Sequence, residues 1–183
     1  MNALAAWTIM ALLCLQEEKQ SVRIQVPDSD ALEVSLPKTW DAKIVQPRPQ
    51  IPPTLRAVAA DRAPLSLQMT FIPLKPGKLS TSEEIKEAVR KGNAQFIEGS
   101  IEKKMEMLQL ESKSGEGYYC SFTDSSLVDV KPIPEGKFLK VLSGIFVINR
   151  TAIPFTILSN PSAADQVKAA LEAVAKTVKP EGK

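Results

Sequence analysis

The chain has 183 residues, a length that suits one domain. Its formal net charge of +2 is too small to predict binding to nucleic acid or to an anionic membrane surface. The lack of histidine removes the commonest general base and zinc ligand, and two cysteines are too few for a disulfide framework or a thiolate metal cluster. We therefore expect no enzyme, no metal site and no cofactor.

An apolar run from Ala3 to Leu15 opens the chain and is interrupted only by Thr8. It is too short to span a bilayer, and its length fits the hydrophobic region of a secretory signal peptide. We expect a signal peptide over residues 1–16 and an exported protein, periplasmic or extracellular. No lysine or arginine precedes the run, so a buried N-terminal helix is the alternative. Cys14 would attach the protein to the membrane if it were acylated, although the residues before it depart from the usual lipobox.

Residues 17–30 are interpreted as a polar lead-in, with an edge strand from Val22 to Val26 as one reading of it, and a single domain is expected over residues 31–180. Apolar and polar residues alternate from Leu32 to Leu36, as in a half-buried strand. Trp40 follows this strand. Its large apolar area favours a lid over the core, with a ligand-stacking platform as the alternative.

Four prolines between residues 41 and 55 predict a semi-rigid extended loop, which either connects strands or carries a binding edge. Residues 55–60 and 65–72 then form an expected hairpin that turns at residues 61–64. In its second strand, Ser66, Gln68 and Thr70 alternate with apolar residues. One face of this part of the sheet is therefore expected to be wetter than the other.

A capping box of Ser80 and Glu83 begins the first expected helix, whose apolar stripe continues to Phe96. Gly99 is the expected cap at its end. Strands are expected next at residues 105–110 and 118–123.

The glycines at positions 115 and 117 predict a hairpin turn between these two strands rather than a phosphate-binding loop. Cys120 has the same parity as Tyr118 and Phe122, which predicts a core position. A reactive thiol is the alternative, although the chain has no histidine to activate it.

The stretch from Phe138 to Asn149 is apolar on both strand faces, which is typical of a central strand covered on both sides. A turn is expected at residues 149–153, followed by an antiparallel strand at residues 154–158. Ser162 is the expected cap of the last helix. Five apolar residues share one face of that helix: Val167, Ala170, Leu171, Val174 and Val178.

This order of elements predicts an α+β fold with an antiparallel sheet. One helix for each face gives a three-layer α-β-α sandwich, the simplest arrangement that buries the two-sided strand.

Several features together resemble the Mog1/PsbP-like superfamily. They are the exported N-terminus, the Pro-x-x-Trp sequence at Pro37 to Trp40, the mid-chain helix, the strand entry at Tyr118 and the final strand that leads into a helix. The chain most resembles the small bacterial exported members similar to the DcrB lipoprotein. The resemblance implies the same fold and an accessory or binding role, and it carries over no catalytic residue.

The leading functional hypothesis is a non-enzymatic accessory domain of the cell envelope that binds an envelope protein through loops at the end of the sheet. The alternative is an extracytoplasmic small-ligand carrier with an apolar pocket. Candidate contacts for a partner or ligand are Trp40, Tyr118 and Asp124. A third hypothesis, a hydrolase, needs at least two of Asp61, Asp124 and Asp129 to converge in a cleft.

Overall fold

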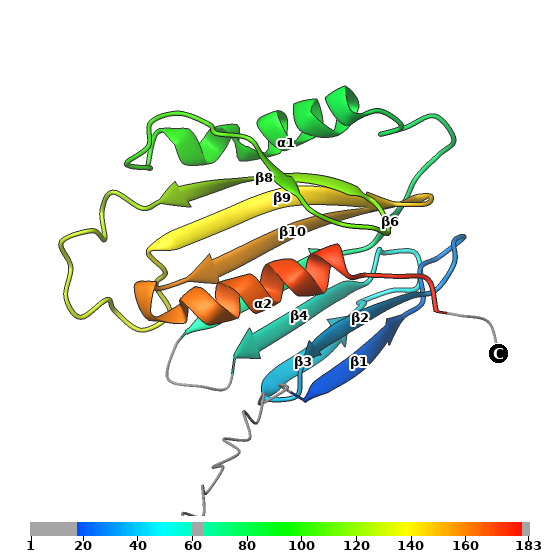
Figure 1. Ribbon diagram of the computed structural model, residues 1–183, viewed down its shortest axis with the longest axis horizontal. Coiled ribbons are helices and arrows are strands. Elements are labelled where there is room, and N and C mark those ends of the chain that lie inside the picture. Colours follow the sequence, from blue (N-terminus) through cyan, green and yellow to red (C-terminus); the bar gives the residue numbers. More distant parts are fainter. Residues whose placement is uncertain (1–17, 60–63, 181–183) are drawn as a thin grey trace, which may run out of the picture.

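The structure is a computed structural model that describes residues 18–59 and 64–180 (Figure 1). The signal peptide expected over residues 1–16, together with Cys14, lies outside the described residues. Within the described ranges, no helix has the length and apolar character needed to cross a membrane.

An eight-stranded antiparallel sheet forms the body of the protein. Its strands, in the order β3-β4-β5-β10-β9-β8-β7 with β6 on the start of β10, are β3 (Trp40–Val45), β4 (Thr54–Ala59), β5 (Leu65–Thr70), β6 (Ile72–Pro73), β7 (Leu108–Leu110), β8 (Glu116–Thr123), β9 (Lys140–Ile148) and β10 (Thr151–Ser159). A separate two-stranded sheet pairs β1 (Lys19–Ile24) with β2 (Leu32–Pro37). The helices are α1 (Ser82–Ile97), α2 (Ala164–Ala175) and a short 3-10 helix, η1 (Pro161–Ala163).

The hairpin of β9 and β10 lies inside this sheet, with further strands on both sides. Its turn holds only Asn149 and Arg150, because Ile148 pairs directly with Thr151. Asn149 has a φ of 52°, in the left-handed region that asparagine tolerates better than most residues. The turn expected at residues 149–153 is therefore wrong, and β10 begins earlier than the sequence predicts.

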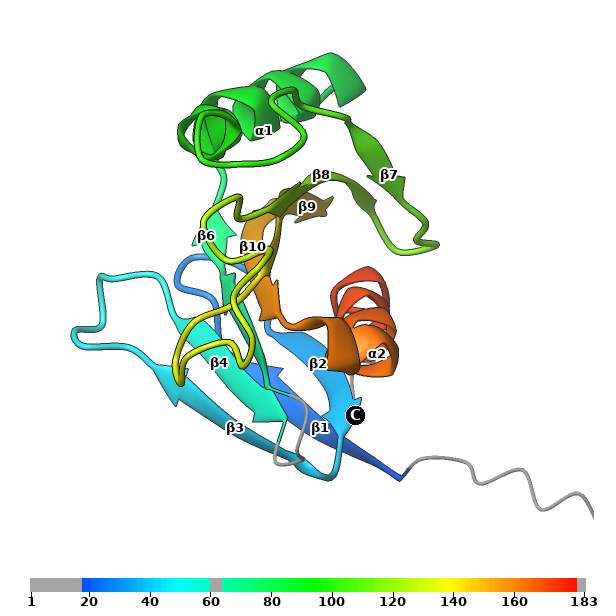
Figure 2. The ribbon, with the colours of Figure 1, turned by 90° about the vertical axis from the view of Figure 1, so that its left-hand side faces the viewer.

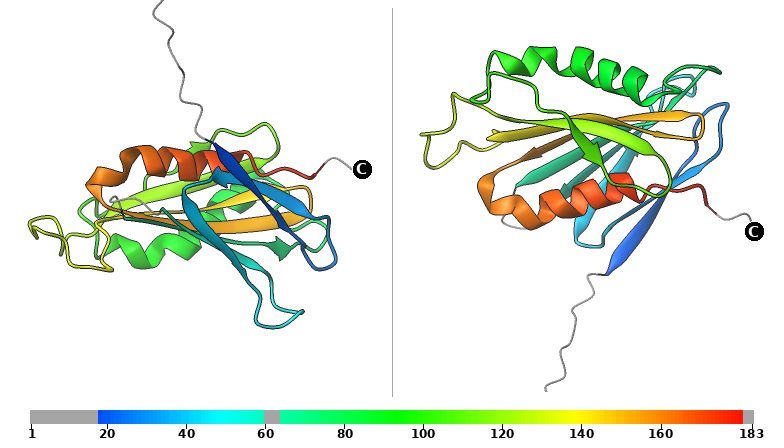
Figure 3. Two further views of the ribbon diagram at one scale, coloured as in Figure 1. Left: turned by 90° about the horizontal axis from the view of Figure 1, so that it is seen from below. Right: turned by 45° about the horizontal axis from the view of Figure 1, so that its top comes forward.

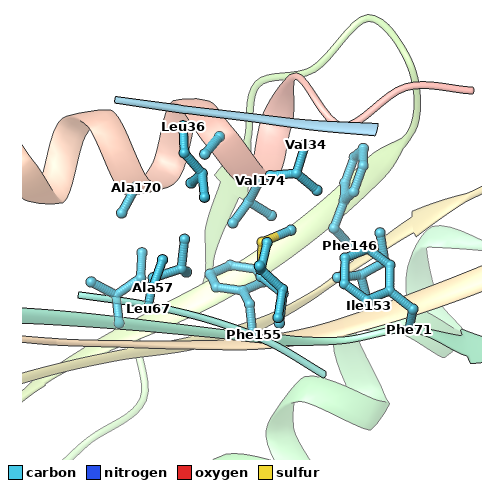
Figure 4. Close-up of a cluster of buried hydrophobic side chains, with 14 of the residues drawn as sticks. Val34, Leu36, Ala57, Leu67, Phe71, Phe146, Ile153, Phe155, Ala170 and Val174 are labelled. Carbon is cyan, nitrogen blue, oxygen red and sulfur yellow. The ribbon is translucent and has the colours of Figure 1, made fainter. Parts of the chain in front are cut away.

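Both faces of β9 are covered, each by a different core. Leu142, Phe146 and Ile148 belong to the larger core, which lies under α2 and the β1–β2 hairpin. Figure 4 shows side chains of β2 and α2 that point toward those of the sheet across this core. Ile145 and Val147 pack against the smaller core, which lies under α1.

The prediction of a mixed α/β fold with a large antiparallel sheet and two helices is confirmed. The layer over the larger core contains more than a helix, because the β1–β2 hairpin packs beside α2 (Figure 3).

The N-terminal part is more regular than the sequence predicts. Strand β1 lies in the segment expected as a polar lead-in, and Ile24 and Val26 are fully buried. Strand β3 occupies the first part of the stretch that was expected as an extended loop, because its residues pair with β4. The loop between them covers only residues 46–53, which contain the four prolines.

The ends of α1 differ from the expected ones by about one residue. Thr81 and Glu84 form the capping box. The cap at the other end is Glu98 in a right-handed helical conformation, so Gly99 is not the cap. Cap-forming residues are adjacent in this part of the sequence, and the pattern alone does not choose between them.

Four further boundaries are corrected. Ser162 lies in η1 and caps no helix, and α2 begins two residues later without a side-chain cap. Val178 lies beyond α2 and forms an isolated β-bridge with Glu33. The strand expected at residues 105–110 is shortened to β7, while residues 105 and 107 pack against the smaller core. The turn expected at residues 115–117 ends before Glu116, which already belongs to β8.

Gly144 of β9 allows a close approach between strands, and its replacement tests the sheet. A β-carbon at this position would lie 2.3 Å from the Tyr118 carbonyl oxygen and 2.5 Å from the Tyr119 Cβ atom. We expect Gly144→Ala to lower the free energy of unfolding by about 1–3 kcal/mol in urea denaturation.

The matched control is Gly92, because nothing lies within 4 Å of the position of its β-carbon. It is inside α1, so Gly92→Ala should raise the free energy of unfolding by about 0.5–1 kcal/mol. Equal stabilities of Gly144→Ala and the wild type would contradict the close approach of β8 and β9.

Candidate interaction surface

Helix α1 covers only part of one face of the large sheet. Its buried residues Ile85 and Val89 pack on β8 and β9, and Figure 2 shows α1 over these strands at the opposite end of the sheet from β3. Among the described residues, no helix packs on the same face of β3, β4 and β5. We call this region the open face, and it consists of the outward-pointing residues Asp41, Lys43, Val45, Thr54, Arg56, Val58, Ser66, Gln68, Thr70, Pro154, Thr156 and Leu158.

Alternation along β4 and β5 separates the open face from the larger core. Leu55 and Leu67 are fully buried, whereas Arg56 and Gln68, the residues next to them, are exposed. Successive strand residues point to opposite sides, so one side of these strands is apolar and the other is largely polar. The wetter face that the sequence predicts at residues 65–72 is the open face.

A row of hydrogen-bonding side chains crosses the open face from β3 toward α1. The register pairs Lys43 with Arg56, Arg56 with Gln68, Gln68 with Thr156 and Thr156 with Ser143. Side chains of directly paired residues lie on the same face with Cβ atoms about 5 Å apart. We call these five residues the polar row.

The polar row begins with two cations at directly paired positions. Lys43 and Arg56 are both exposed, and neither is within 4.0 Å of a carboxylate of the described residues. Like charges at such a pair repel each other and reduce the stability of a sheet. Asp41 lies two positions from Lys43 on the same strand face, so this end of the open face carries two cations and one carboxylate, a net charge of +1.

A groove of about 280 Å³ separates α1 from the sheet at the other end of the polar row. Its walls include Asn93 of α1 together with Gln68, Ser143 and Thr156. Asn93 is only 2% exposed, and its Nδ2 atom donates a hydrogen bond to the Ser143 carbonyl oxygen at 3.1 Å. Its Oδ1 atom is buried and has no donor among the described residues. Asn93, one of the residues that line the groove, thus has a buried acceptor that these residues do not satisfy.

The loop between β3 and β4, residues 46–53, projects beside the open face (Figure 3). The Gln46 side chain donates hydrogen bonds to the carbonyl oxygens of Pro49 (3.2 Å) and Ile51 (3.1 Å). The Ile51 backbone N–H donates to the Arg48 carbonyl oxygen at 3.0 Å, which closes a turn. Ile51 itself is 42% exposed. The loop therefore presents an apolar side chain on a backbone that prolines and hydrogen bonds hold in place.

The three contact residues predicted from the sequence lie in separate places. Trp40 is 4% exposed in the larger core, which agrees with a lid over the core and leaves little of its ring at the surface. Tyr118 is 7% exposed in the smaller core. Asp124 follows β8, and its carboxylate accepts hydrogen bonds from the Ser126 backbone (2.9 Å) and side chain (2.7 Å), which lower the pKa of Asp124. The structure does not bring these residues together as one site.

A small polar network fixes the start of α1 against β8. The Glu116 carboxylate accepts hydrogen bonds from the Ser82 hydroxyl (2.5 Å) and the Tyr118 hydroxyl (2.7 Å). These two bonds, the Ser82 bond first, lower the pKa of Glu116. The Lys86 ammonium lies 5.0 Å from the centre of the Tyr118 ring, within range of a cation–π interaction. The network positions a helix and offers no free acid or base.

Those of the remaining candidate groups that the structure describes form no reactive cluster. Cys120 is fully buried, and burial raises the pKa of its thiol, which disfavours the reactive thiolate form. Asp61 lies outside the described residues, so its convergence with Asp124 or Asp129 is not tested. In the part of the chain that the structure describes, no three side chains of histidine, cysteine, aspartate or glutamate gather where they would hold a metal ion.

Comparison with known proteins gives little beyond this geometry. No family model matches the chain, and no curated protein matches its sequence. Among solved structures, the chain is similar to the solution structure of cyanobacterial PsbP (CyanoP) from Synechocystis sp. PCC 6803, with a TM-score of 0.47 and 14% identity over 94% of this chain and 95% of that one. At this level, the similarity assigns neither a family nor a function.

Trp40→Ala separates a core role from a contact role for this residue. Because the indole is buried in the larger core, its removal should lower the free energy of unfolding by about 3–5 kcal/mol in urea denaturation. Trp40→Phe, which keeps most of the apolar area, should cost clearly less. A Trp40→Ala protein with wild-type stability would contradict the core position.

Glu116→Gln tests the network at the start of α1 through its dependence on pH. The pKa of Glu116 is lowered from its ordinary value of 4.5 in the folded protein, so the carboxylate stabilises the fold above that pH. This contribution is lost as the pH falls through the lowered value. We therefore expect the melting temperature of Glu116→Gln to be below that of the wild type at pH 7, with a smaller difference at pH 3.

Glu106→Gln is the control, because Glu106 is exposed and accepts no hydrogen bond from a described side chain. The melting temperature of Glu106→Gln should differ little from that of the wild type at both pH 7 and pH 3. If the melting temperature of Glu116→Gln stays equally far below that of the wild type at low pH, or falls further below it, the role of the ionised carboxylate is refuted.

Proposed function

We propose that the protein is a non-enzymatic accessory domain that binds a protein partner through the open face and the adjoining loop at residues 46–53. The observation that supports this proposal best is the open face itself. The opposite side of the same strands is buried under α2 and the β1–β2 hairpin, whereas on this side no helix among the described residues packs over β3, β4 and β5. A broad, mixed polar and aliphatic surface of this kind suits a protein partner.

The loop supports the same role because its apolar tip is already ordered. A loop that is fixed before binding loses less conformational entropy in a complex than a flexible one. Ile51 stands on a turn that is closed by the Gln46 side chain and the backbone. It lies at the end of β3 and β4, as expected for a contact through loops at the sheet end.

The observations give less support to a small-ligand carrier with an apolar pocket. The large side chains of the larger core, such as Phe71, Phe146 and Phe155, are almost completely excluded from solvent. A hollow of about 530 Å³ opens at the surface beside residues 111–114 and the end of α2. Two serine hydroxyls lie in its wall. Ser112 donates its hydroxyl hydrogen to the Ala175 carbonyl oxygen and Ser114 to that of Thr177, so neither hydrogen is free to bind a ligand.

The location of the domain is part of the proposal. The apolar run at residues 3–15 supports export to the periplasm or the extracellular space, and an envelope protein is then the natural partner. Acylation of Cys14 would place the domain at the membrane surface.

An Ile51→Asp variant tests the contact. The full-length protein would be immobilised and exposed to an envelope extract of its own organism, and retained proteins would be identified by mass spectrometry. We expect the wild type to retain a partner that Ile51→Asp retains at least about tenfold less, because a charge at a desolvated apolar contact is costly.

Ile101→Asp is the matched control, since Ile101 is another exposed isoleucine (50%, against 42% for Ile51) in a different loop. It should retain the partner as the wild type does. Circular dichroism must show that both variants fold. Equal retention by wild type and Ile51→Asp would place the contact elsewhere and count against the proposal.

A further inference from the structure

We infer that the open face binds an acidic, extended peptide segment, with a carboxylate of that peptide held between Lys43 and Arg56. The inference rests on the proposed function and names the chemistry of the partner at the same surface. Each step depends on residues of the polar row and on the groove at its inner end.

The net positive charge at the outer end of the polar row, where Lys43 and Arg56 outnumber Asp41, favours an anion. Lys43 and Arg56 are directly paired and exposed, and no carboxylate of the described chain is within 4.0 Å of them. An anionic group between them would turn their mutual repulsion into two attractions. A carboxylate suits this position, because a guanidinium binds it through two parallel hydrogen bonds while the lysine adds a third.

The neighbouring side chains favour a peptide over a nucleic acid or a glycan. Nucleobases stack on aromatic side chains. The ring faces of sugars also pack against aromatic side chains. None of the twelve residues that define the open face is aromatic. Aliphatic residues flank the polar row on both sides instead, Val58 and Leu158 on one side and Val45 and Pro154 on the other. Such a surface matches a segment that alternates acidic and aliphatic residues.

The length of the polar row fits a short extended segment. It spans four strand-to-strand steps from β3 to β9, which is about 19 Å at a spacing of about 4.8 Å. An extended chain advances about 3.4 Å per residue, so about six residues cross the whole row. Gln68 and Thr156, in the middle, offer hydrogen-bonding groups to the backbone of a peptide in this orientation.

The inner end of the row provides an independent reason to expect a peptide. Asn93 is buried beside the groove, and its Oδ1 atom has no donor among the residues that the structure describes. Buried acceptors in proteins normally have a donor. A peptide brings backbone N–H groups as well as carboxylates, so a single ligand can serve both ends of the row if the Asn93 side chain turns its Oδ1 atom toward the groove on binding.

The test is a titration of the full-length protein, labelled with ¹⁵N, with a decapeptide of alternating glutamate and valine, followed by NMR. We expect amide shifts at the polar row and weaker binding as the salt concentration rises. The same peptide with glutamine in place of glutamate should bind at least about tenfold more weakly.

Charge reversal makes the test specific. Lys43→Glu/Arg56→Glu should weaken binding of the acidic decapeptide at least about tenfold and bind the corresponding lysine–valine decapeptide instead. The control Lys104→Glu/Lys131→Glu makes the same change in net charge, from +2 to −2, at two other exposed lysines in separate loops. It should bind the acidic peptide as the wild type does, apart from a small loss from the net charge.

Three results would overturn the inference: equal binding of the glutamate and glutamine peptides, equal effects of the two double variants, or shifts that map away from the open face. Tighter binding of heparin than of the peptide, with the same shifts, would also overturn it in favour of an anionic glycan. If the partner found in the extract still depends on Ile51 in any of these cases, the proposed function stands and only the acidic partner chemistry fails. If the peptide test fails and retention of a partner from the extract does not depend on Ile51 either, the proposed function is rejected as well.

Discussion

The need to cover β9 on both faces determines the rest of this structure. Its alternate residues are large and apolar on both sides, so each side must meet a separate core. The side of Phe146 is covered by α2 together with the β1–β2 hairpin. The side of Ile145 is covered by one helix, α1, with neighbouring loop residues such as Met105 and Met107. A helix about 10 Å wide covers roughly two strands at a spacing of about 4.8 Å. In an eight-stranded sheet, one helix therefore leaves several strands bare on its side, and the open face is a direct result.

The sequence adapts to this unequal cover. Where both sides are buried, as in β9, apolar residues occupy both parities, and where one side is bare, as in β4 and β5, polar residues occupy one of them. These local periodicities made the β4–β5 hairpin, β9 and both helices predictable. Strand β3 is not predictable in the same way, because the four prolines that follow it indicate an extended loop from residue 41 onward. Apolar and charged residues alternate from Trp40 to Ile44, which indicates a strand, but this pattern is short and lies next to the prolines.

The candidate surface was harder to predict than the fold. Trp40 and Tyr118 were chosen because large aromatic side chains are common in contacts, but the same apolar area explains why both lie in cores. Lys43 and Arg56 are thirteen positions apart, and each alone is an ordinary surface residue. Their significance comes from the pairing of β3 with β4 and from the absence of a nearby carboxylate in the described chain. Strand register is long-range information that a single sequence does not contain.

The position of β10 has a consequence for how the protein is made. This strand joins the two parts of the large sheet, since it pairs with β5 on one side and β9 on the other, and it comes after all the other strands of that sheet in the sequence. During synthesis, β5 and β9 each have an unpaired edge until β10 has emerged. Such edges invite pairing with other chains, and contacts between residues as distant in sequence as Leu67 and Ile157 form slowly. The nascent chain is therefore most exposed to aggregation just before its last strand is added, and a binding factor that protects it would act at that moment.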